Sequence, residues 1–372
     1  MKKYLFFMFY CLVQQINAEQ FLYPVADFDK EKKIVLIYQK SLDDIELWIW
    51  DCHQNKATQA LSSFSTPANL RIMPSGNGFS FIDQGHIKVK EFIKRSAKTI
   101  PIYEPINSFS SMNWINNEEF YFIAREGDFF QIFQADTQSN VKRLTNQPIN
   151  HLYPQKINEQ LFYIKQDLNH NYEICLKGWD PMLMESPKKI EDTTLVTSGD
   201  QLCFLEMINA SKGFYLKVVG NQSDENFYEF VCSSFENKNN KWESQDLFSF
   251  KIPLRYIHGP ERLYESIQPF LPNYKHENHI YFVDYSTENI CAELYNYHIP
   301  TAKKIRLSNE VKSNHKNNII KSTQFIAPYL HNEKIYFGLI MHENRQINFM
   351  DDTFVQKNNH FELPFFQTKE KS

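Results

Sequence analysis

The residues of this chain that are best suited to hold a metal ion are histidines beside a predicted strand. His276 and His279 stand three residues apart in the run His-Glu-Asn-His, and Glu277 or His258 could complete a cation site. Histidines at a short spacing share one ion most readily when a helix places both on one face, whereas this run lies in a turn. We therefore expect a solvated turn at this position.

Acidic residues at the ends of predicted strands form the second set that could do chemistry. A ring of carboxylates at one end of a channel could bind Ca²⁺ or cleave a glycoside or lactone. An aspartate that ends a strand more often accepts hydrogen bonds from the amides of the next turn, and we expect that role here. The set comprises Asp43, Asp44, Asp51, Asp83, Asp136, Asp180, Asp284, Asp351 and Asp352.

Signature motifs of common enzyme classes do not occur in the sequence. It contains no G-x-S-x-G of serine hydrolases, no P-loop and no G-x-G-x-x-G. We therefore assign no catalytic, cofactor-binding or metal-ligating residue, and we expect no cofactor.

Short aromatic strands that recur along the chain must position these side chains. Residues 118–145 (EEFYFIAREGDFFQIFQADTQSNVKRLT) read as three strands separated by polar turns. The first of these strands, at residues 120–124, has counterparts at residues 33–38, 79–83, 161–165, 202–206, 280–284 and 335–339. The starts at 79, 120, 161 and 202 are evenly spaced, and a period of about 40 residues is typical of β-propellers. We predict an all-β fold, a β-propeller with seven blades of antiparallel strands, with six or eight blades as alternatives.

The domain organisation predicted from the sequence is a leader, one propeller and a tail. Lys2 and Lys3 precede an apolar run at residues 4–13, and a short segment ends in Ala18, as in a cleaved secretory signal. The run is too short to cross a bilayer. We expect a signal peptide at residues 1–18 cleaved after Ala18, a single propeller at 19–366 and a frayed tail at 367–372. An uncleaved anchor or a buried first strand is the alternative. The wide spacing after residue 206 indicates an irregular insertion at about 234–264, an extra hairpin or a weak blade.

The net charge restricts the class of partner, and the number and spacing of the cysteines restrict the possible disulfides. The formal net charge is −4, whereas nucleic-acid binding needs a basic footprint, so we expect no nucleic-acid partner. No segment of the sequence is long and apolar enough to cross a membrane, so we expect no membrane span. Loss of the leader with Cys11 leaves five of the six cysteines, an odd and widely spaced set that favours buried free thiols and leaves one disulfide open. These five are Cys52, Cys175, Cys203, Cys232 and Cys291. Trp114 and Trp242, flanked by polar residues, are candidate surface aromatics.

The pattern of the repeats resembles that of the TolB-like β-propeller family. The residues that carry the likeness are FQIFQAD from Phe130 to Asp136, followed by Arg143-Leu144-Thr145, with weaker copies at 45–51 and 293–297. The resemblance covers roughly residues 33 to 355, but the Ser-Pro-Asp-Gly turn of the family is missing. Because the repeats start close to the expected mature terminus, we expect the propeller without the α/β domain that precedes it in TolB. It implies a periplasmic or secreted propeller that contacts proteins through its loops.

We therefore predict a non-enzymatic protein-binding scaffold that is periplasmic or secreted, is monomeric and has a protein partner in the cell envelope. The alternative is a secreted propeller hydrolase or lyase that acts on a glycan or lactone with channel carboxylates and a divalent cation. The two hypotheses differ in whether three or more strand-end acids, or His258, His276 and His279, converge at one end of the channel.

Overall fold

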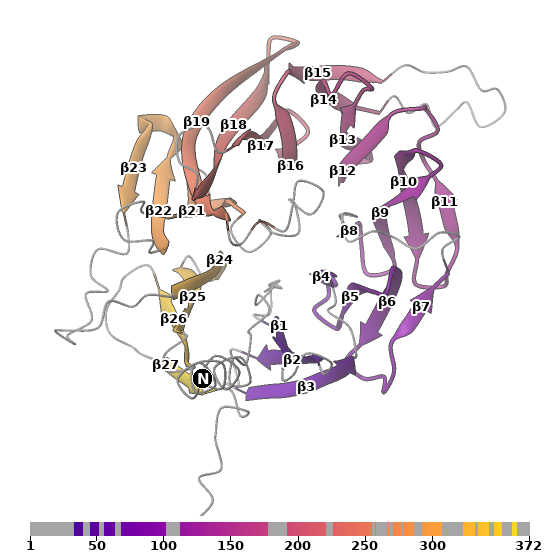
Figure 1. The fold of residues 1–372 in the computed structure, drawn as a ribbon, viewed down its shortest axis with the longest axis vertical. Coiled ribbons are helices and arrows are strands. Elements are labelled where there is room, and N and C mark those ends of the chain that lie inside the picture. Colours follow the sequence, from indigo (N-terminus) through magenta and orange to yellow (C-terminus); the bar gives the residue numbers. More distant parts are fainter. Residues whose placement is uncertain are drawn as a thin grey trace, which may run out of the picture.

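The computed structural model describes the greater part of the chain and shows sheets arranged around a centre (Figure 1). The described residues are 33–39, 45–51, 56–63, 68–101, 112–177, 192–220, 226–254, 257, 267, 271–276, 278–285, 292–306, 323–331, 334–341, 346–351 and 359–362. Nearly all of them lie in antiparallel strands, which form one three-stranded and six four-stranded sheets. In the first and seventh sheets the description is almost wholly of the backbone.

Each sheet consists of strands that follow one another in the sequence. The first contains β1 (Lys33–Gln39), β2 (Ile45–Asp51) and β3 (Lys56–Ser63), and the second β4 (Ala68–Ile72), β5 (Gly78–Asp83), β6 (His86–Glu91) and β7 (Lys98–Ile100). The third contains β8 (Met112–Trp114), β9 (Glu119–Glu126), β10 (Phe129–Asp136) and β11 (Val141–Arg143), and the fourth β12 (Asn150–Ile157), β13 (Gln160–Gln166), β14 (Tyr172–Leu176) and β15 (Thr193–Ser198). The fifth contains β16 (Gln201–Asn209), β17 (Lys212–Gly220), β18 (Phe227–Lys238) and β19 (Lys241–Pro253). The sixth contains β20 (Asn273–His276), β21 (His279–Tyr285), β22 (Ala292–His298) and β23 (Lys303–Arg306), with the 3-10 helix η4 (Ile299–Thr301) before β23. The seventh contains β24 (Thr323–His331), β25 (Lys334–Met341), β26 (Gln346–Asp351) and β27 (Asn359–Glu362).

This arrangement confirms the predicted all-β propeller class. A four-stranded antiparallel sheet returns the chain to the end where it began, so the first strands of successive sheets run in the same direction around the centre. The described strands form seven sheets, and the count of seven blades for the whole chain stays a prediction.

The blade boundaries differ from the predicted ones in the middle of the chain. The predicted leading strand is the second strand of its sheet at residues 79–83, 120–124 and 161–165, but the first strand of its sheet at 202–206. Residues 234–253 of the expected irregular insertion are regular, because they lie in β18 and β19, which pair with each other and complete the fifth sheet. The leader at residues 1–18 and the tail at 367–372 lie outside the described residues and stay predictions.

Aromatic side chains fill the space between neighbouring sheets. Phe122 of β9 packs in one cluster with Ile82 and Ile87 of the second sheet, while Phe282 of β21 packs in another with Phe248 of β19. The Phe248 and Phe282 rings are stacked, with centroids 4.0 Å apart. Burial of such a side chain stabilises the fold by roughly 1.5–3 kcal/mol, which explains why a chain with 15% aromatic residues can hold its blades together face to face.

Three cysteines take part in this packing. Cys175, Cys203 and Cys232 are free thiols and are buried, which confirms the prediction for them. Burial raises the pKa of the Cys175 thiol to about 12, so it stays neutral and behaves as a small apolar side chain. Cys52 and Cys291 lie outside the described residues.

Polar side chains on the inner strands bind the backbone of the next inner strand. The Arg71 Nε atom on β4 donates to the Met112 carbonyl oxygen on β8 at 3.1 Å. The Asn113 side-chain amide on β8 donates to the Pro154 carbonyl oxygen on β12 at 2.8 Å. Inner strands of neighbouring sheets are therefore joined by hydrogen bonds from side chain to backbone as well as by apolar packing.

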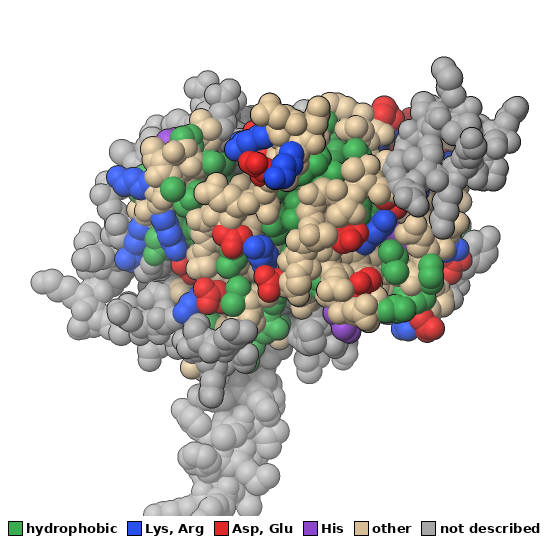
Figure 2. Space-filling view, turned by 90° about the horizontal axis from the view of Figure 1, so that it is seen from above, with side chains coloured by type: hydrophobic (Ala, Val, Ile, Leu, Met, Phe, Trp, Pro, Cys, Tyr) green, Lys and Arg blue, Asp and Glu red, His purple; other side chains and the backbone are tan. Residues whose placement is uncertain are grey.

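The next two observations concern the distribution of charge on the surface and the length of the helices. On the side of the molecule seen in Figure 2, acidic and basic side chains are interspersed rather than gathered by sign. Within the described ranges, none of the helices is long and apolar enough to cross a membrane. The expected lack of a nucleic-acid partner stays a prediction.

Candidate functional site

Asp136, the strand-end acid of β10, caps the turn that follows it. Its Oδ1 atom accepts the backbone N–H groups of Gln138 at 2.9 Å and Asn140 at 2.8 Å, and its Oδ2 atom accepts the Asn140 side-chain amide at 2.7 Å. The Asn140 side chain and the turn N–H groups lower the pKa of this carboxyl. Asp167 and Asn171 make the same contacts after β13, a turn that the sequence analysis missed although the spacing Asp-x-x-x-Asn is identical. The expected turn role is confirmed for Asp136.

Asp83 and Asp284 are neutralised by lysines within the framework. Asp83 is buried and forms an ion pair with Lys88 of the same sheet. Asp284 accepts the backbone N–H of Lys251 at 2.7 Å and the Nζ of Lys304 at 2.7 Å. Asp83 lies in the second sheet and Asp284 in the sixth, and the two candidate acids are paired with different lysines.

The remaining predicted acids contribute no described side chain. Asp51 and Asp351 are described as backbone positions at the ends of β2 and β26. Asp43, Asp44, Asp180 and Asp352 lie outside the described residues, as do Glu277 and His258. Among the residues whose side chains the structure describes, no group of three or more His, Cys, Asp and Glu is placed to hold a metal ion.

The sixth sheet brings three histidines to one register position. His276 on β20 is opposite His279 on β21, and His279 is opposite His298 on β22. The His279 and His298 rings have centroids 4.7 Å apart and an interplanar angle of 36°. Both rings are half-buried, so the expectation of a solvated turn is wrong for His279. His298 was missed, because only strand pairing brings it next to His279.

Each imidazole of this pair has one hydrogen bond, made by its Nδ1 atom. His279 Nδ1 lies 3.0 Å from the Asn296 Oδ1 atom, and since an amide oxygen only accepts, the imidazole donates. His298 Nδ1 lies 2.7 Å from the Thr301 hydroxyl. Within the described part of the chain, neither Nε2 atom has a hydrogen-bond partner.

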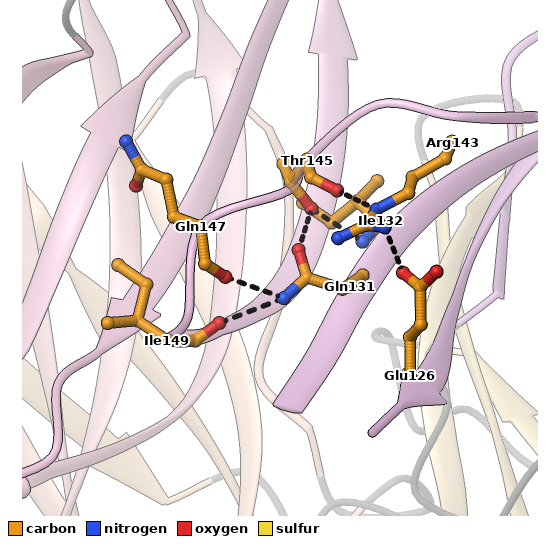
Figure 3. Close-up of polar contacts among 7 residues, drawn as sticks. All are labelled: Glu126, Gln131, Ile132, Arg143, Thr145, Gln147 and Ile149. Atoms are coloured by element: carbon orange, nitrogen blue, oxygen red, sulfur yellow. Dashed lines mark hydrogen bonds and ion pairs between the residues drawn. The ribbon is translucent and has the colours of Figure 1, made fainter. Parts of the chain in front are cut away.

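Gln131 is the centre of a buried polar network at the junction of the third and fourth sheets (Figure 3). Its Oε1 atom accepts the Thr145 hydroxyl at 2.8 Å, and its Nε2 atom donates to the carbonyl oxygens of Gln147 at 2.9 Å and Ile149 at 3.2 Å. The Thr145 oxygen in turn accepts the Ile132 backbone N–H at 2.9 Å. The side-chain amide is therefore fully used, and it fastens the connection between two blades.

The Arg-Leu-Thr segment that carried the family resemblance has a structural role in this network. Arg143 forms an ion pair with Glu126 and donates to the Thr145 carbonyl oxygen (Figure 3). The Leu144 backbone N–H donates to the Ile132 carbonyl oxygen at 2.8 Å. The segment thus attaches the outer strand of the blade to its third strand.

A second buried polar cluster lies on the face of the fourth sheet that packs against the third. The Lys165 Nζ and Asp192 Oδ2 atoms are 2.7 Å apart, and both side chains are largely buried. Burial alone would raise the pKa of Asp192, but the bonds from Lys165 and Tyr163 lower it, and the net shift is downward. Burial raises the pKa of Tyr163, so the phenol stays neutral. The cluster is a compensated ion pair inside the blade packing.

His151 of β12 lies beside this ion pair and is 1% exposed. Its ring centroid is 5.5 Å from that of Tyr163. Burial, followed by the charge of Lys165, lowers the pKa of His151 to about 4, so the imidazole is neutral at pH 7. Its Nδ1 atom is buried without a hydrogen bond in the described structure, which adds to the cost of protonation.

The two tryptophans expected at the surface pack against their neighbours. Trp114 is half-buried, lies 5.0 Å from the Phe120 ring and donates its Nε1 hydrogen to the Ser80 hydroxyl at 3.0 Å. Trp242 is half-buried and lies 5.5 Å from the Phe235 ring. Both side chains therefore contribute to packing between or within blades.

Comparison with known proteins supports the fold class. No family model matches the sequence, and no curated protein matches it. The fold is similar to the β-propeller domain of Cps50 (Swd1) from Myceliophteria thermophila, with a TM-score of 0.52, 10% identity and coverage of 87% of this chain and 95% of that chain. A putative TolB from Agrobacterium tumefaciens gives a TM-score of 0.45, 12% identity and coverage of 61% and 81%. The TolB of Acinetobacter baumannii gives a TM-score of 0.43, 13% identity and coverage of 70% of this chain and 59% of that chain.

The fold and its likeness to the Cps50 (Swd1) propeller domain define the class of the protein. It is a β-propeller, built from consecutive antiparallel sheets that pack face to face around a centre. The finer TolB-like assignment stays a prediction.

Proposed function

We propose that this chain is a non-enzymatic β-propeller scaffold of the TolB-like type that binds a protein partner in the cell envelope. The observation that carries the proposal is the state of the strand-end acids. Asp83, Asp136 and Asp284, which the alternative hydrolase would need in a channel, each neutralise or accept hydrogen bonds from the framework itself. A carboxylate held in this way stabilises the blade that carries it and is not placed to act as an acid or base.

The location is part of the same proposal. The pattern of Lys2 and Lys3, the apolar run at residues 4–13 and Ala18 supports export and cleavage. We infer a mature chain that begins at Glu19, acts in the periplasm or outside the cell, and is monomeric. Mass spectrometry of the protein purified from its own envelope fraction checks the N-terminus, and light scattering checks the mass.

Among the described residues, the two most exposed large apolar side chains lie at opposite ends of the propeller. Ile93, in the turn between β6 and β7, is 91% exposed, and Leu168, in the turn between β13 and β14, is 73% exposed. One turn follows the third strand of a sheet and the other follows the second, so they lie at opposite ends of the propeller axis. A scaffold that binds through one loop face should use one of these ends.

Matched variants at these two positions test the proposal. Wild type, Ile93→Asp and Leu168→Asp, each as residues 19–372, are immobilised and exposed to cross-linked envelope extract, and retained proteins are quantified by mass spectrometry. Both substitutions are at exposed sites, so the folds should be equally stable. We expect a protein that the wild type and one variant retain and the other variant loses.

The alternative hydrolase gives a different result in a parallel assay. Cleavage of glycoside or lactone substrates by the wild type, abolished in Asp284→Asn, would contradict the proposal. So would equal retention of every protein by all three immobilised forms.

A further inference from the structure

Two histidines that lie side by side on neighbouring strands of the sixth sheet, His279 and His298, have side chains of a type that binds metal ions. His276, His279 and His298 stand opposite one another on three neighbouring strands. Residues directly opposite on antiparallel strands lie about 4.5–5.5 Å apart, which is a distance at which two imidazoles can share one ion. The 4.7 Å between the ring centroids of His279 and His298 agrees with this spacing.

The hydrogen bonds of His279 and His298 use the Nδ1 atoms and leave the Nε2 atoms for a metal. His279 donates from Nδ1 to Asn296 Oδ1, which fixes the tautomer with the lone pair on Nε2. His298 Nδ1 contacts the Thr301 hydroxyl, which can accept a hydrogen bond from the same tautomer. Imidazoles that bind a metal almost always donate their other ring N–H to a hydrogen-bond acceptor, commonly a carboxylate, a backbone carbonyl or water, which orients the ring. Asn296 is buried in the sixth sheet.

We propose that His279 and His298 bind a divalent transition-metal ion of the zinc type on the sixth sheet. Imidazole nitrogen suits Zn²⁺, Ni²⁺ and Cu²⁺ and is a poor ligand for Mg²⁺ and Ca²⁺, which prefer oxygen. The proposal goes beyond the scaffold function and does not depend on it. Since the two ligands lie on β21 and β22, the bound ion fastens these strands and stabilises the folded state by an amount that grows with the logarithm of its free concentration above the dissociation constant.

The surroundings of the pair allow a cation to approach. Tyr281 stacks beside His279, with ring centroids 6.2 Å apart. Lys303 is opposite His298 on β23, and its side chain is exposed, so its charge is screened by solvent. Half-burial of both imidazoles leaves positions on the ion for water.

Zinc titration of histidine variants tests the site. The protein is residues 19–372 without a histidine tag, and ZnCl₂ is titrated by calorimetry in a background of excess MgCl₂. We expect one zinc ion per chain for the wild type and for His170→Ala, whose exposed imidazole lies in the turn between β13 and β14 of the fourth sheet. His279→Gln and His298→Gln should each weaken binding by about tenfold or more. Equal binding by the wild type and both glutamine variants would overturn the proposal, as would no binding by the wild type.

A second measurement uses the wild type alone and is independent of variant folding. Diethyl pyrocarbonate modifies free imidazole nitrogens, and peptide mass spectrometry reports the modified fraction at each histidine. With ZnCl₂ present, His279 and His298 should be protected and His170 should react as before. Unchanged modification of His279 and His298 on addition of zinc would contradict the site.

Discussion

The Oε1 atom of Gln155 accepts the backbone N–H of Met207 at 2.7 Å and thereby joins the inner strand of the fourth sheet to that of the fifth. The Nε2 atom of the same side chain donates to the Leu205 carbonyl oxygen at 2.8 Å. A break in the register between Leu152 and Gln155, with Tyr153 at a φ of 52°, turns the strand at this point. One amide thus satisfies a donor and an acceptor of the neighbouring blade.

Removal of this amide should destabilise the propeller. Gln155→Ala leaves the Met207 N–H and the Leu205 carbonyl, both on buried residues, without their partner. We expect a decrease in the free energy of unfolding of about 1–3 kcal/mol, measured by urea denaturation. Gln134→Ala, which removes a bond to Glu119 within one sheet, is the control and should cost less. Equal losses in the free energy of unfolding for both variants would show that the hydrogen bonds of Gln155 between blades stabilise the fold no more than a bond within one sheet.

The hydroxyl of Thr145 should matter more than its methyl group. Thr145→Val keeps the shape but removes the acceptor of the Ile132 N–H and the donor to Gln131. Because these groups are buried, the expected loss in the free energy of unfolding is about 1–3 kcal/mol. Hydrogen exchange at the Ile132 amide should accelerate in the same variant. Thr145→Ser keeps the hydroxyl and should retain slow exchange, and a fast amide in Thr145→Ser would refute this role.

His151 should make stability depend on pH below neutrality. Its pKa in the folded protein is about 4 against an ordinary value of 6.5, so the folded state favours the neutral ring. The stabilisation is complete above pH 6.5 and is lost as the pH falls from 6.5 to 4, by up to about 3 kcal/mol. Urea denaturation across this interval measures it, and His151→Phe should flatten the curve while His170→Ala leaves it unchanged. An NMR titration of His151 with a midpoint near 6.5 would contradict this account.

The stability that the Asp136 and Asp167 carboxylates contribute to their turns should be lost at low pH. The Asn140 side chain and neighbouring N–H groups lower the pKa of Asp136, and the Asn171 side chain does the same for Asp167. A lowered carboxyl pKa gives stability that is present above the unfolded value near 4 and is lost as the pH falls through the folded value. NMR titration of both side-chain carboxyls should place their midpoints below that of an unstructured aspartate. Asp136→Ala should also increase hydrogen exchange at the Asn140 amide, and unchanged exchange would argue against the cap.

Local features of the fold follow from the sequence because neighbouring residues decide them. The predicted strands at residues 120–124 and 129–135 lie within β9 and β10. Gly127 has a φ of +60°, a conformation that a glycine adopts without strain, and it forms the turn between them. Asp136 caps its turn as its type and position indicate.

The division into blades required more than local pattern. Residues 192–233 match one repeat in the sequence, but the structure ends the fourth sheet at Ser198 and begins the fifth at Gln201. An aromatic strand looks the same in sequence whether it is the first or the second strand of its sheet. Its place depends on which strand pairs with it, and that pairing is a contact between distant residues.

By itself the sequence determined the strand periodicity, the turn chemistry and the aromatic content, and these are enough to predict a β-propeller. Tertiary structure alone decided which polar side chains meet. It placed His298 beside His279, Gln155 against Met207 and Asp192 on Lys165. In each pair the partners belong to different strands or segments, so their approach is set by strand register and blade packing. Those are properties of the assembled fold that the local sequence does not encode.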